Sequence, residues 1–418
     1  METYQNAENR GKKKRGFWAG MLLGTSATLL IVVIVCAGLF AYRYVQMQQM
    51  QQMQQNAAET IADTGMQMKM QTIEQIIDFY YYKDDVDAEA LSDGVYRGMM
   101  DAIGDPYSTY YSAAELKSLM EQTEGIYYGI GAYVALDTVS GLPKIASAIP
   151  GTPAEAADLR PDDIIYKVDG QEVYGMDLTA VTALIKGEEG TTVNLTIIRE
   201  GESDYLSVDV VRKKVETPTV EYEMFDDGMA YIQIIEFNDA TVPQFTDALA
   251  MAKGSDMQGL IIDLRANPGG NLDAVVRIAQ MLLPEGLIVY TEDKYGNREE
   301  YKCDGKHKFE YPLVVLIDGN SASASEILAG SIQDYEIGTL VGTTTFGKGI
   351  VQQVITLNDQ SAVKITVSSY YTPKGRNIHG VGIEPDIVCE FDGEAYYNED
   401  FDNQLEYAKE VLAEKIAE

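Results

Sequence analysis

Two stretches of the chain follow one plan: a continuous apolar run, a glycine- or serine-rich turn, and a helix-forming segment. They are GLIIDLRANPGGNLDAVVRIAQMLL (259–283) and PLVVLIDGNSASASEILAGSIQDY (312–335), and the apolar run 228–237 with the helical pattern 242–254 precedes them. Strands that alternate with helices predict an α/β core with a largely parallel sheet whose faces are covered by helices. Functional groups of such a core belong in the loops that leave the carboxyl ends of its strands.

A separate β-rich module precedes this core. From Gly125 the pattern changes to short strands, and Asp169-Gly170 is a strong two-residue hairpin signal. At 418 residues the chain is long enough for two or three domains. We predict a β-rich domain over 125–214, an α/β core over 215–390 and a C-terminal helical segment over 391–418.

The N-terminal part contains a run of 26 residues without a charge, from Phe17 to Tyr42. About 20 apolar residues cross a bilayer as a helix, and the basic residues at 12–15 place the N-terminus in the cytoplasm by the positive-inside rule. A cleaved signal peptide is the alternative, but its apolar region is usually only about 7–15 residues long. We predict a cytoplasmic tail at 1–15, a transmembrane anchor at 16–42, a Gln/Met-rich stalk at 43–71 and amphipathic helices at 72–124.

Composition argues against several classes of function. The net charge of −33 repels phosphate backbones, so nucleic acid is not an expected partner. Three widely spaced cysteines, Cys36, Cys303 and Cys389, make neither a disulfide framework nor a zinc knuckle. With only two histidines as well, the chain shows no pattern for a His/Cys metal site, and no cofactor is expected.

The turn after the second apolar run holds three serines, Ser321, Ser323 and Ser325. A serine between a strand and a helix is a candidate nucleophile, but Ser323 and Glu326 also form a capping-box pattern, which is a structural role. GNSAS resembles the Gly-x-Ser-x-Gly nucleophile elbow without its last glycine, an interpretation that makes Ser321 the nucleophile and His379 its base. The alternatives differ in which residue takes the serine proton.

Lysine is the other residue that can accept a serine proton. Its pKa must fall from about 10.4 to roughly 7.5, a shift worth about 4 kcal/mol, and burial in an apolar site can produce it. Lys348 fits this requirement, because it lies between two glycines in TTTFGKGIVQQVI (343–355), a stretch without an acidic residue. In an extended segment Lys348 and Gln352 point to one face, so Gln352 can orient the amine once the glycines bend the chain.

Four blocks of the sequence carry a resemblance to a known family. They are DLRANPGGNLDAVV, NSASASEILAGSIQDY, GTTTFGKGIVQ and SSYYTPKGRNIHGVGIEPDI. From about Thr72 to Cys389 the chain resembles the C-terminal-processing (tail-specific) serine peptidases, which carry a PDZ domain. The resemblance implies a crotonase-like core in which Ser323 is the nucleophile, Lys348 its base and Gln352 the residue that positions the lysine.

The same resemblance implies an oxyanion hole made of backbone N–H groups at Gly269 and Ala324. A helix N-terminus presents free N–H groups, which suits a developing negative charge. Neither His307 nor His379 then has a catalytic role.

By resemblance, residues 125–214 are a PDZ domain, which binds a chain end as an added strand. Gly129-Ile130-Gly131 is the expected turn for the terminal carboxylate, and 132–136 is the expected edge strand. Asp158 and Asp162 replace glycines of the family pattern, and aspartate tolerates the left-handed conformation better than most residues.

The expected function is a membrane-anchored, extracytoplasmic serine endopeptidase. Its expected partners are proteins or peptides with exposed apolar C-termini and the membrane that holds the anchor, while association into a homo-oligomer stays open. The competing class is a binding protein, a tethered PDZ receptor whose peptidase fold is inert. The presence of Ser323, Lys348 and Gln352 together favours the enzyme.

Overall fold

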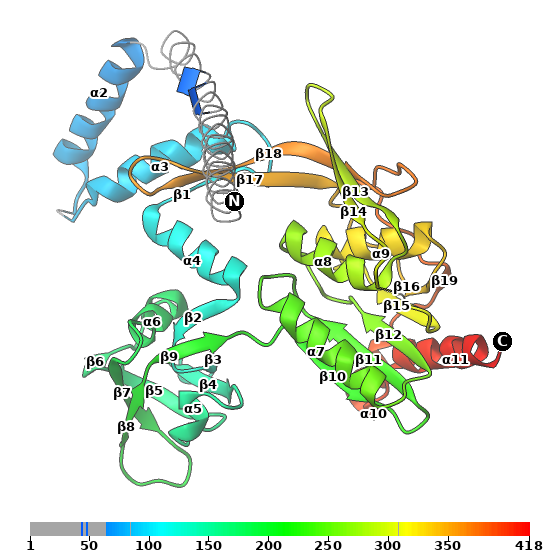
Figure 1. The fold of residues 1–418 in the computed structure, drawn as a ribbon. Coiled ribbons are helices and arrows are strands. Elements are labelled where there is room, and N and C mark those ends of the chain that lie inside the picture. Colours follow the sequence, from blue (N-terminus) through cyan, green and yellow to red (C-terminus); the bar gives the residue numbers. More distant parts are fainter. Residues whose placement is uncertain (1–42, 45–46, 49–63, 84, 308) are drawn as a thin grey trace, which may run out of the picture. The chain divides into compact units, whose positions relative to one another are not determined.

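The computed structural model describes residues 43–44, 47–48, 64–83, 85–307 and 309–418 (Figure 1). The chain divides into two compact units, residues 1–88 and 89–418. The predicted tail at 1–15, the predicted anchor at 16–42 and most of the predicted stalk at 43–71 lie outside the described residues. Among the helices that are described, none is long and apolar enough to span a membrane.

Helix α2 (Thr64–Tyr80) of the first unit begins inside the predicted stalk. The prediction that the helices start at 72 was therefore wrong. Methionine, glutamine and lysine are good helix formers and no proline interrupts them here, so the helix includes residues 64–71 of the predicted stalk.

Two helices open the second unit, and they confirm the helical pattern predicted up to residue 124. They are α3 (Ala88–Asp101) and α4 (Ala113–Glu124). The Ser112 side chain accepts from the N–H of Glu115, and the Glu115 carboxylate accepts from the N–H of Ser112. Gly125 ends α4 in the left-handed conformation, with φ 66°. The β-rich module starts directly after this cap.

The β-rich module contains one main sheet of order β3-β4-β5-β7-β8, with β6 paired to β5, and a two-stranded ribbon of β2 and β9. Its strands are β2 (Ile126–Gly129), β3 (Ala132–Leu136), β4 (Pro143–Ala148), β5 (Ile164–Val168), β6 (Gln171–Glu172), β7 (Thr192–Ile198), β8 (Leu206–Val211) and β9 (Lys213–Glu216), and its helices are α5 (Pro153–Ala156) and α6 (Leu178–Ile185). The predicted edge strand is confirmed as β3. Asp158 and Asp162 have φ of 57° and 68°, the left-handed conformation of the glycines they replace.

The α/β core is built on a six-stranded sheet of order β10-β11-β12-β15-β16-β19. β10 pairs antiparallel with β11, and all the other pairs are parallel, which confirms the largely parallel sheet. The strands are β10 (Val220–Met224), β11 (Met229–Ile234), β12 (Gly259–Asp263), β15 (Leu313–Ile317), β16 (Thr339–Gly342) and β19 (Ile387–Val388).

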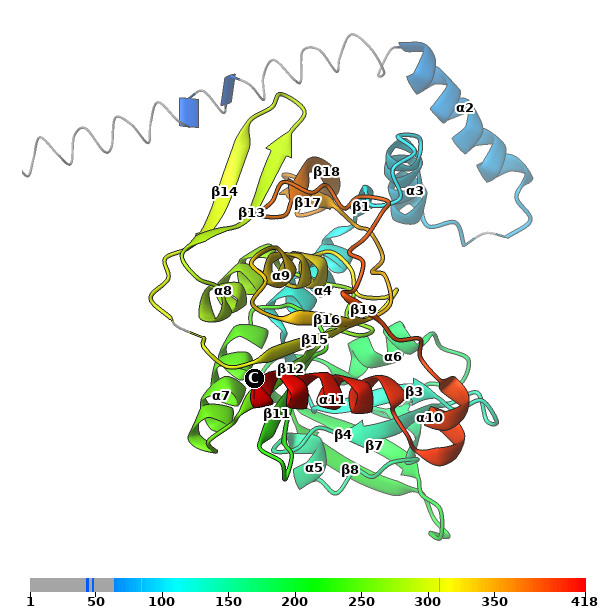
Figure 2. The same ribbon diagram turned by 90° about the vertical axis from the view of Figure 1, so that its right-hand side faces the viewer.

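Helices cover both faces of this sheet (Figure 2). They are α7 (Thr241–Gly254), α8 (Leu272–Leu282) and α9 (Ala324–Asp334) on one face, and α11 (Asn403–Ala417) on the other. In β15, Val315 packs towards α7–α9 while its neighbours Val314 and Leu316 pack towards α11. The segment predicted to be helical at 391–418 is helical, and its helix α11 covers the second face of the parallel sheet. Only the short α10 (Gly393–Glu399) lies between core and α11 in sequence.

A second sheet places part of the N-terminal region beside the core. Its order is β1-β18-β13-β14, and β17 pairs with β18. The strands are β1 (Thr109–Tyr111), β13 (Gly286–Asp293), β14 (Arg298–Cys303), β17 (Ile350–Thr356) and β18 (Ala362–Tyr371). β1 thus lies against the same strand, β18, as the strand that carries Gln352 (Figure 1).

Candidate active site

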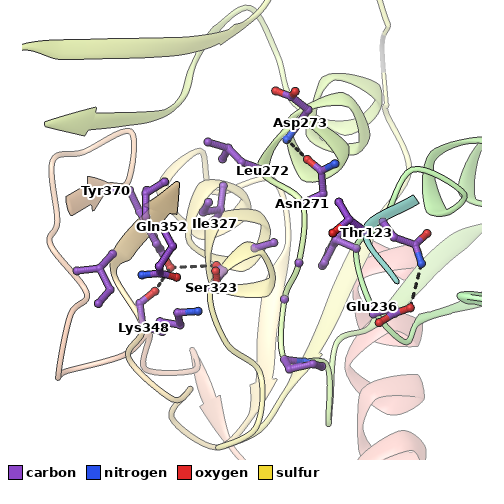
Figure 3. Close-up of a pocket in the computed structure, with 18 of the residues that line it drawn as sticks. Thr123, Glu236, Asn271, Leu272, Asp273, Ser323, Ile327, Lys348, Gln352 and Tyr370 are labelled. Atoms are coloured by element: carbon purple, nitrogen blue, oxygen red, sulfur yellow. Dashed lines mark hydrogen bonds between the residues drawn. The ribbon is translucent and has the colours of Figure 1, made fainter. Parts of the chain in front are cut away.

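A cavity of about 810 Å³ lies beside the loops that follow β12, β15 and β16 at their carboxyl ends. This is the position predicted for the functional groups of a parallel sheet. All five predicted residues of the catalytic site line the cavity: Gly269, Ser323, Ala324, Lys348 and Gln352. Figure 3 shows the side chains of Ser323, Lys348 and Gln352 gathered at one end.

Ser323 occupies the turn between β15 and α9, with φ 53° and ψ −110°. Residues other than glycine rarely adopt a positive φ, and such a conformation persists only where the surroundings impose it. The N–H of Ser323 donates to the carboxylate of Glu326 at 2.8 Å, which is one of the two hydrogen bonds of the predicted capping box. Ser323 also lines the cavity. The capping role and a nucleophilic role are therefore compatible.

The two neighbouring serines are completely buried and hold the loop in place. The Ser321 hydroxyl donates to the carbonyl of Leu264 at 2.7 Å, and the Ser325 hydroxyl donates to the carbonyl of Asn267 at 3.0 Å. His379 is exposed and does not line the cavity. This geometry gives no support to a Ser321–His379 pair.

Lys348 lies in the loop after β16 and is half-buried. Its Nζ lies 4.8 Å from the centroid of the Tyr107 ring. Burial lowers the pKa of Lys348 below its usual value, and the charge of Lys364 lowers it further, while the carboxylates of Asp105 and Glu326 oppose this shift. The local sequence around Lys348 contains no acid, but the fold brings two acids near it. Burial prevails, which favours the neutral amine.

Gln352 lies on β17, where its Nε2 donates to the Thr366 hydroxyl at 3.2 Å. The pairing of β17 with β18 shifts register between Val351 and Gln352. Such an irregularity bends a strand and re-aims its side chains. The expected bend between Lys348 and Gln352 therefore comes from this irregularity, which the sequence did not show, while the positive φ of Gly347 (87°) turns the chain just before Lys348.

The tyrosine-rich turn at 104–111 also belongs to the site. Besides the ring of Tyr107, it contributes Ser108, whose hydroxyl accepts from the N–H of Thr366 at 3.0 Å and donates to Asp105 at 2.5 Å. These bonds connect the turn to the partner of Gln352. Sequence reasoning missed this role, because the turn precedes the β-rich module and the catalytic loops follow it.

The predicted oxyanion position is defined by close packing. A Cβ on Gly269 (φ 100°) would lie 2.8 Å from the Cβ of Ser323 and 2.9 Å from the nitrogen of Ala324, so only glycine fits there. The Gly269 N–H donates to Oδ1 of Asn267 at 2.8 Å. Among the residues that the structure describes, the N–H groups of Gly270 and Ala324 find no acceptor.

Two further residues of the site were not singled out by sequence reasoning. Glu326 was noticed only as part of a capping box, and Tyr370 was not noticed at all. Both are buried, and both form hydrogen bonds with the backbones of Ser323 and Lys348. The position of Glu326 three residues after the cap was the only local signal.

The predicted carboxylate-binding turn lies in the β-rich module and does not line the cavity. Gly131 has φ 80°, and a Cβ there would lie 2.3 Å from the Cβ of Thr152. Gly129 ends β2, and within the described part of the chain the N–H groups of Ile130 and Gly131 find no acceptor. The edge strand β3 and helix α6 pack beside one another next to this turn.

Comparison with known proteins identifies three segments. Residues 228–389 match peptidase family S41, residues 144–199 match a PDZ domain, and residues 32–114 match the N-terminal domain of the activating protease CtpB. The match to the PDZ family lies within the predicted range 125–214, and the match to the peptidase family lies within the predicted range 215–390.

Two relatives and one solved structure are similar to this chain over most of its length. The carboxy-terminal processing protease CtpA of Bacillus subtilis is 37% identical over 80% of this chain and 71% of its own length. CtpB of the same organism is 34% identical over 78% of this chain and 69% of its own length. A solved photosystem II D1 C-terminal processing protease is 32% identical, with a TM-score of 0.46, and the match covers 76% of this chain and 86% of that one. The chain belongs to the carboxy-terminal processing serine peptidases of family S41 and carries a PDZ domain.

Proposed function

We propose that this peptidase cuts peptide bonds through an acyl-enzyme on Ser323, with Lys348 as the general base. One observation carries the proposal. Ser323, Gln352 and a half-buried Lys348 of lowered pKa line a single cavity, although they come from different loops and strands. A perturbed titratable group beside a hydroxyl in a cleft is the arrangement that an activated nucleophile requires.

The chemistry follows from the neutral amine. Nζ of Lys348 accepts the hydroxyl proton of Ser323 while its Oγ forms a bond to the scissile carbonyl carbon. The tetrahedral intermediate then collapses, the C–N bond breaks, and the lysine ammonium returns the proton to the leaving amine. Water attacks the resulting ester with Lys348 again as base, which releases the acyl product and restores the serine.

The oxyanion is stabilised by backbone N–H groups at the start of α9 and in the turn after β12. Ala324 offers an N–H without an acceptor among the described residues, at the positive end of the helix. We assign the second donor to Gly269, whose N–H must turn from Asn267 to the substrate, with the N–H of Gly270 beside it. Gln352 holds the amine of Lys348 by hydrogen bonding, without a charge that would raise its pKa.

The PDZ domain captures the C-terminal tail of the substrate. The free edge of β3 receives the tail as an added strand, and the N–H groups of the turn Gly129-Ile130-Gly131 meet the terminal carboxylate. Two of these N–H groups find no acceptor within the described chain, which supports this role. We place the apolar side chains of the tail beside β3 and α6, which pack against each other.

The enzyme is anchored in the cell membrane with its catalytic part outside the cytoplasm. This part of the proposal rests on the sequence, in which 26 uncharged residues from Phe17 to Tyr42 follow a basic cluster at 12–15. Labelling intact cells with a membrane-impermeant reagent tests it, because a tag after residue 418 should react and a tag before residue 1 should not.

Hydrolysis of an unfolded reporter with an apolar tail tests the chemistry. In the full chain, Ser323→Ala and Lys348→Ala should each abolish hydrolysis. Ser325→Ala and His379→Ala should keep much of it, because neither side chain reaches the cavity. Full activity in Lys348→Ala would refute the lysine mechanism, and loss in His379→Ala would favour a histidine base.

A further inference from the structure

The carboxylate of Glu326 has no exposed surface, yet it accepts four hydrogen bonds from the two catalytic loops. Oε1 accepts from the Thr345 hydroxyl at 2.6 Å and from the Gly347 N–H at 2.7 Å. Oε2 accepts from the Ser323 N–H at 2.8 Å and from the Lys348 N–H at 2.9 Å. One oxygen atom therefore joins the backbone of the proposed nucleophile to the backbone of the proposed base.

Tyr370 joins the same two residues from the carbonyl side. Its hydroxyl lies 3.0 Å from the carbonyl oxygen of Ser323 and 2.6 Å from that of Lys348, and its proton is available to both (Figure 3). The Tyr370 side chain is almost completely buried, and burial raises its pKa well above the usual value, so the hydroxyl stays a donor at working pH.

We propose that Glu326 is a positioning residue of the peptidase reaction: together with the hydroxyl of Tyr370, its carboxylate fixes the relative placement of Ser323 and Lys348. This inference rests on the proposed function of those two residues. A proton passes between two side chains only when both are held in register, and a misplacement of about 1 Å can slow an enzyme about a hundred-fold.

The backbone on both sides of the contact needs such support. Ser323 has a positive φ that its side chain disfavours, and Lys348 lies in a loop between two glycines. Hydrogen bonds to the N–H and the carbonyl of each residue leave neither peptide free to rotate. Strained conformations at functional sites persist where surrounding contacts determine them in this way.

The chemistry of the four donors explains why the residue is a glutamate. An ionised carboxylate is acceptor-only, with about four lone-pair sites, and all four are used here. Glutamine would replace one oxygen by an NH₂ group that faces two donors. The charge itself works against a basic lysine, because Glu326 raises the pKa of Lys348. Its benefit to the reaction is therefore geometric.

Steady-state kinetics of the full chain with the tailed reporter tests the inference. Glu326→Gln should lower kcat about a hundred-fold with KM changed less than about three-fold, since the substrate does not contact a buried carboxylate. In the pH profile of the residual activity, the acid limb, where activity falls as pH decreases, should also lie at lower pH. The groups facing Lys348 are Lys364, Asp105, Tyr107 and Glu326, and removing one carboxylate from this set lowers the lysine pKa.

Asp334→Asn is the matched control. Asp334 is a buried carboxylate on the same helix, paired with Arg376 and accepting from the N–H of Lys374, and it does not line the cavity. Asp334→Asn should lower the thermal midpoint of unfolding, while kcat and the acid limb of the pH profile stay unchanged. If the role of Glu326 is purely structural, Glu326→Gln should also have a lower thermal midpoint with kcat and the acid limb unchanged. That result would overturn the inference.

Tyr370→Phe covers the case in which Glu326→Gln does not fold, because it deletes one hydroxyl and keeps the buried ring. It should lower kcat about ten-fold or more at unchanged KM. If Glu326→Gln does not fold, an unchanged kcat in Tyr370→Phe overturns the inference. The proposed roles of Ser323 and Lys348 are tested separately, because they fail if Ser323→Ala or Lys348→Ala remains active.

Discussion

Nζ of Lys348 lies 4.8 Å from the centroid of the Tyr107 ring, although Tyr107 precedes the PDZ domain in the chain and Lys348 follows it. The ring has two opposite effects on the amine. Its face attracts an ammonium by roughly 0.5–2 kcal/mol, which favours the charged form. It also contributes to the burial of the amine, and burial is the largest influence on the pKa of Lys348. We expect the second effect to prevail.

Removal of the ring should therefore shift the pH dependence of hydrolysis. In Tyr107→Ala water reaches the amine, the pKa of Lys348 rises, and the acid limb of kcat/KM moves to higher pH, because only the neutral amine is a base. Below the pKa, each unit of rise lowers the neutral fraction about ten-fold. Tyr107→Phe should keep the wild-type profile, and so should Tyr96→Ala, which removes a tyrosine that packs on Tyr110. A shift of the Tyr107→Ala limb to lower pH would mean that attraction to the ring prevails.

Two charged neighbours of Lys348 should shift the same limb in opposite directions. Lys364 lowers the pKa of Lys348 and Asp105 raises it. Lys364→Gln should therefore move the acid limb to higher pH, and Asp105→Asn should move it to lower pH. The measurement is kcat/KM from pH 5 to 9 at low ionic strength, where screening is weakest. Lys364→Arg keeps the charge and is the control. Shifts of the same sign in both glutamine and asparagine variants would contradict this electrostatic account.

The parts of the fold that follow from local patterns were predicted from the sequence. The apolar run before the NPGG turn became β12, and the run before the serine cluster became β15, each buried on both faces. Two aspartates in the PDZ domain took the left-handed conformation expected of glycine replacements. In each case the determining interactions lie within a few residues of the pattern.

The parts that depend on distant contacts were not predicted. Glu326 becomes important because the loop of Lys348 folds over it, and Tyr107 because β1 pairs with β18. The periodicity of the sequence does not reveal such contacts, and the pairing of β1 with β18 joins segments on opposite sides of the PDZ domain. The packing of α11 against the core was not predicted for the same reason. Its apolar residues contact the face of the sheet that the other helices leave uncovered, and this contact joins distant parts of the chain.

Helix α11 should contribute to stability and not to catalysis. Leu412 is completely buried against the core sheet, where its Cδ1 would lie 2.8 Å from a Cβ on Gly259. Leu412→Ala should lower the free energy of unfolding by about 2–5 kcal/mol, as expected for a large-to-small change in a packed core. Glu414→Ala on the exposed side of the helix should change it by less than about 0.5 kcal/mol. Urea unfolding measures both, and kcat of the folded Leu412→Ala enzyme should equal that of the wild type. A lowered kcat would show that α11 reaches the site indirectly.

The PDZ domain should select tails by their terminal carboxylate. If the turn Gly129-Ile130-Gly131 holds the terminal carboxylate, amidation of the substrate's C-terminus removes the charge that those N–H groups meet. Hydrogen bonds to charged groups are worth roughly 1.5–3 kcal/mol, so kcat/KM should fall about ten-fold or more. The loss should appear mainly at low substrate concentration, because the carboxylate is remote from the scissile bond.

Gly131→Ala should reproduce this loss with free-acid substrates, since its Cβ would lie 2.3 Å from Thr152 and displace the turn. Gly141→Ala is the matched control: Gly141 has a similar φ of 70°, but nothing lies within 4 Å of its added Cβ. Both variants carry the same backbone strain, so only the displaced turn distinguishes them. Amidated and free-acid peptides cut with equal efficiency would mean that this turn does not bind the chain end. The N–H groups of Ile130 and Gly131, which have no acceptor among the described residues, would then require another partner, and the PDZ domain would have a role other than carboxylate capture.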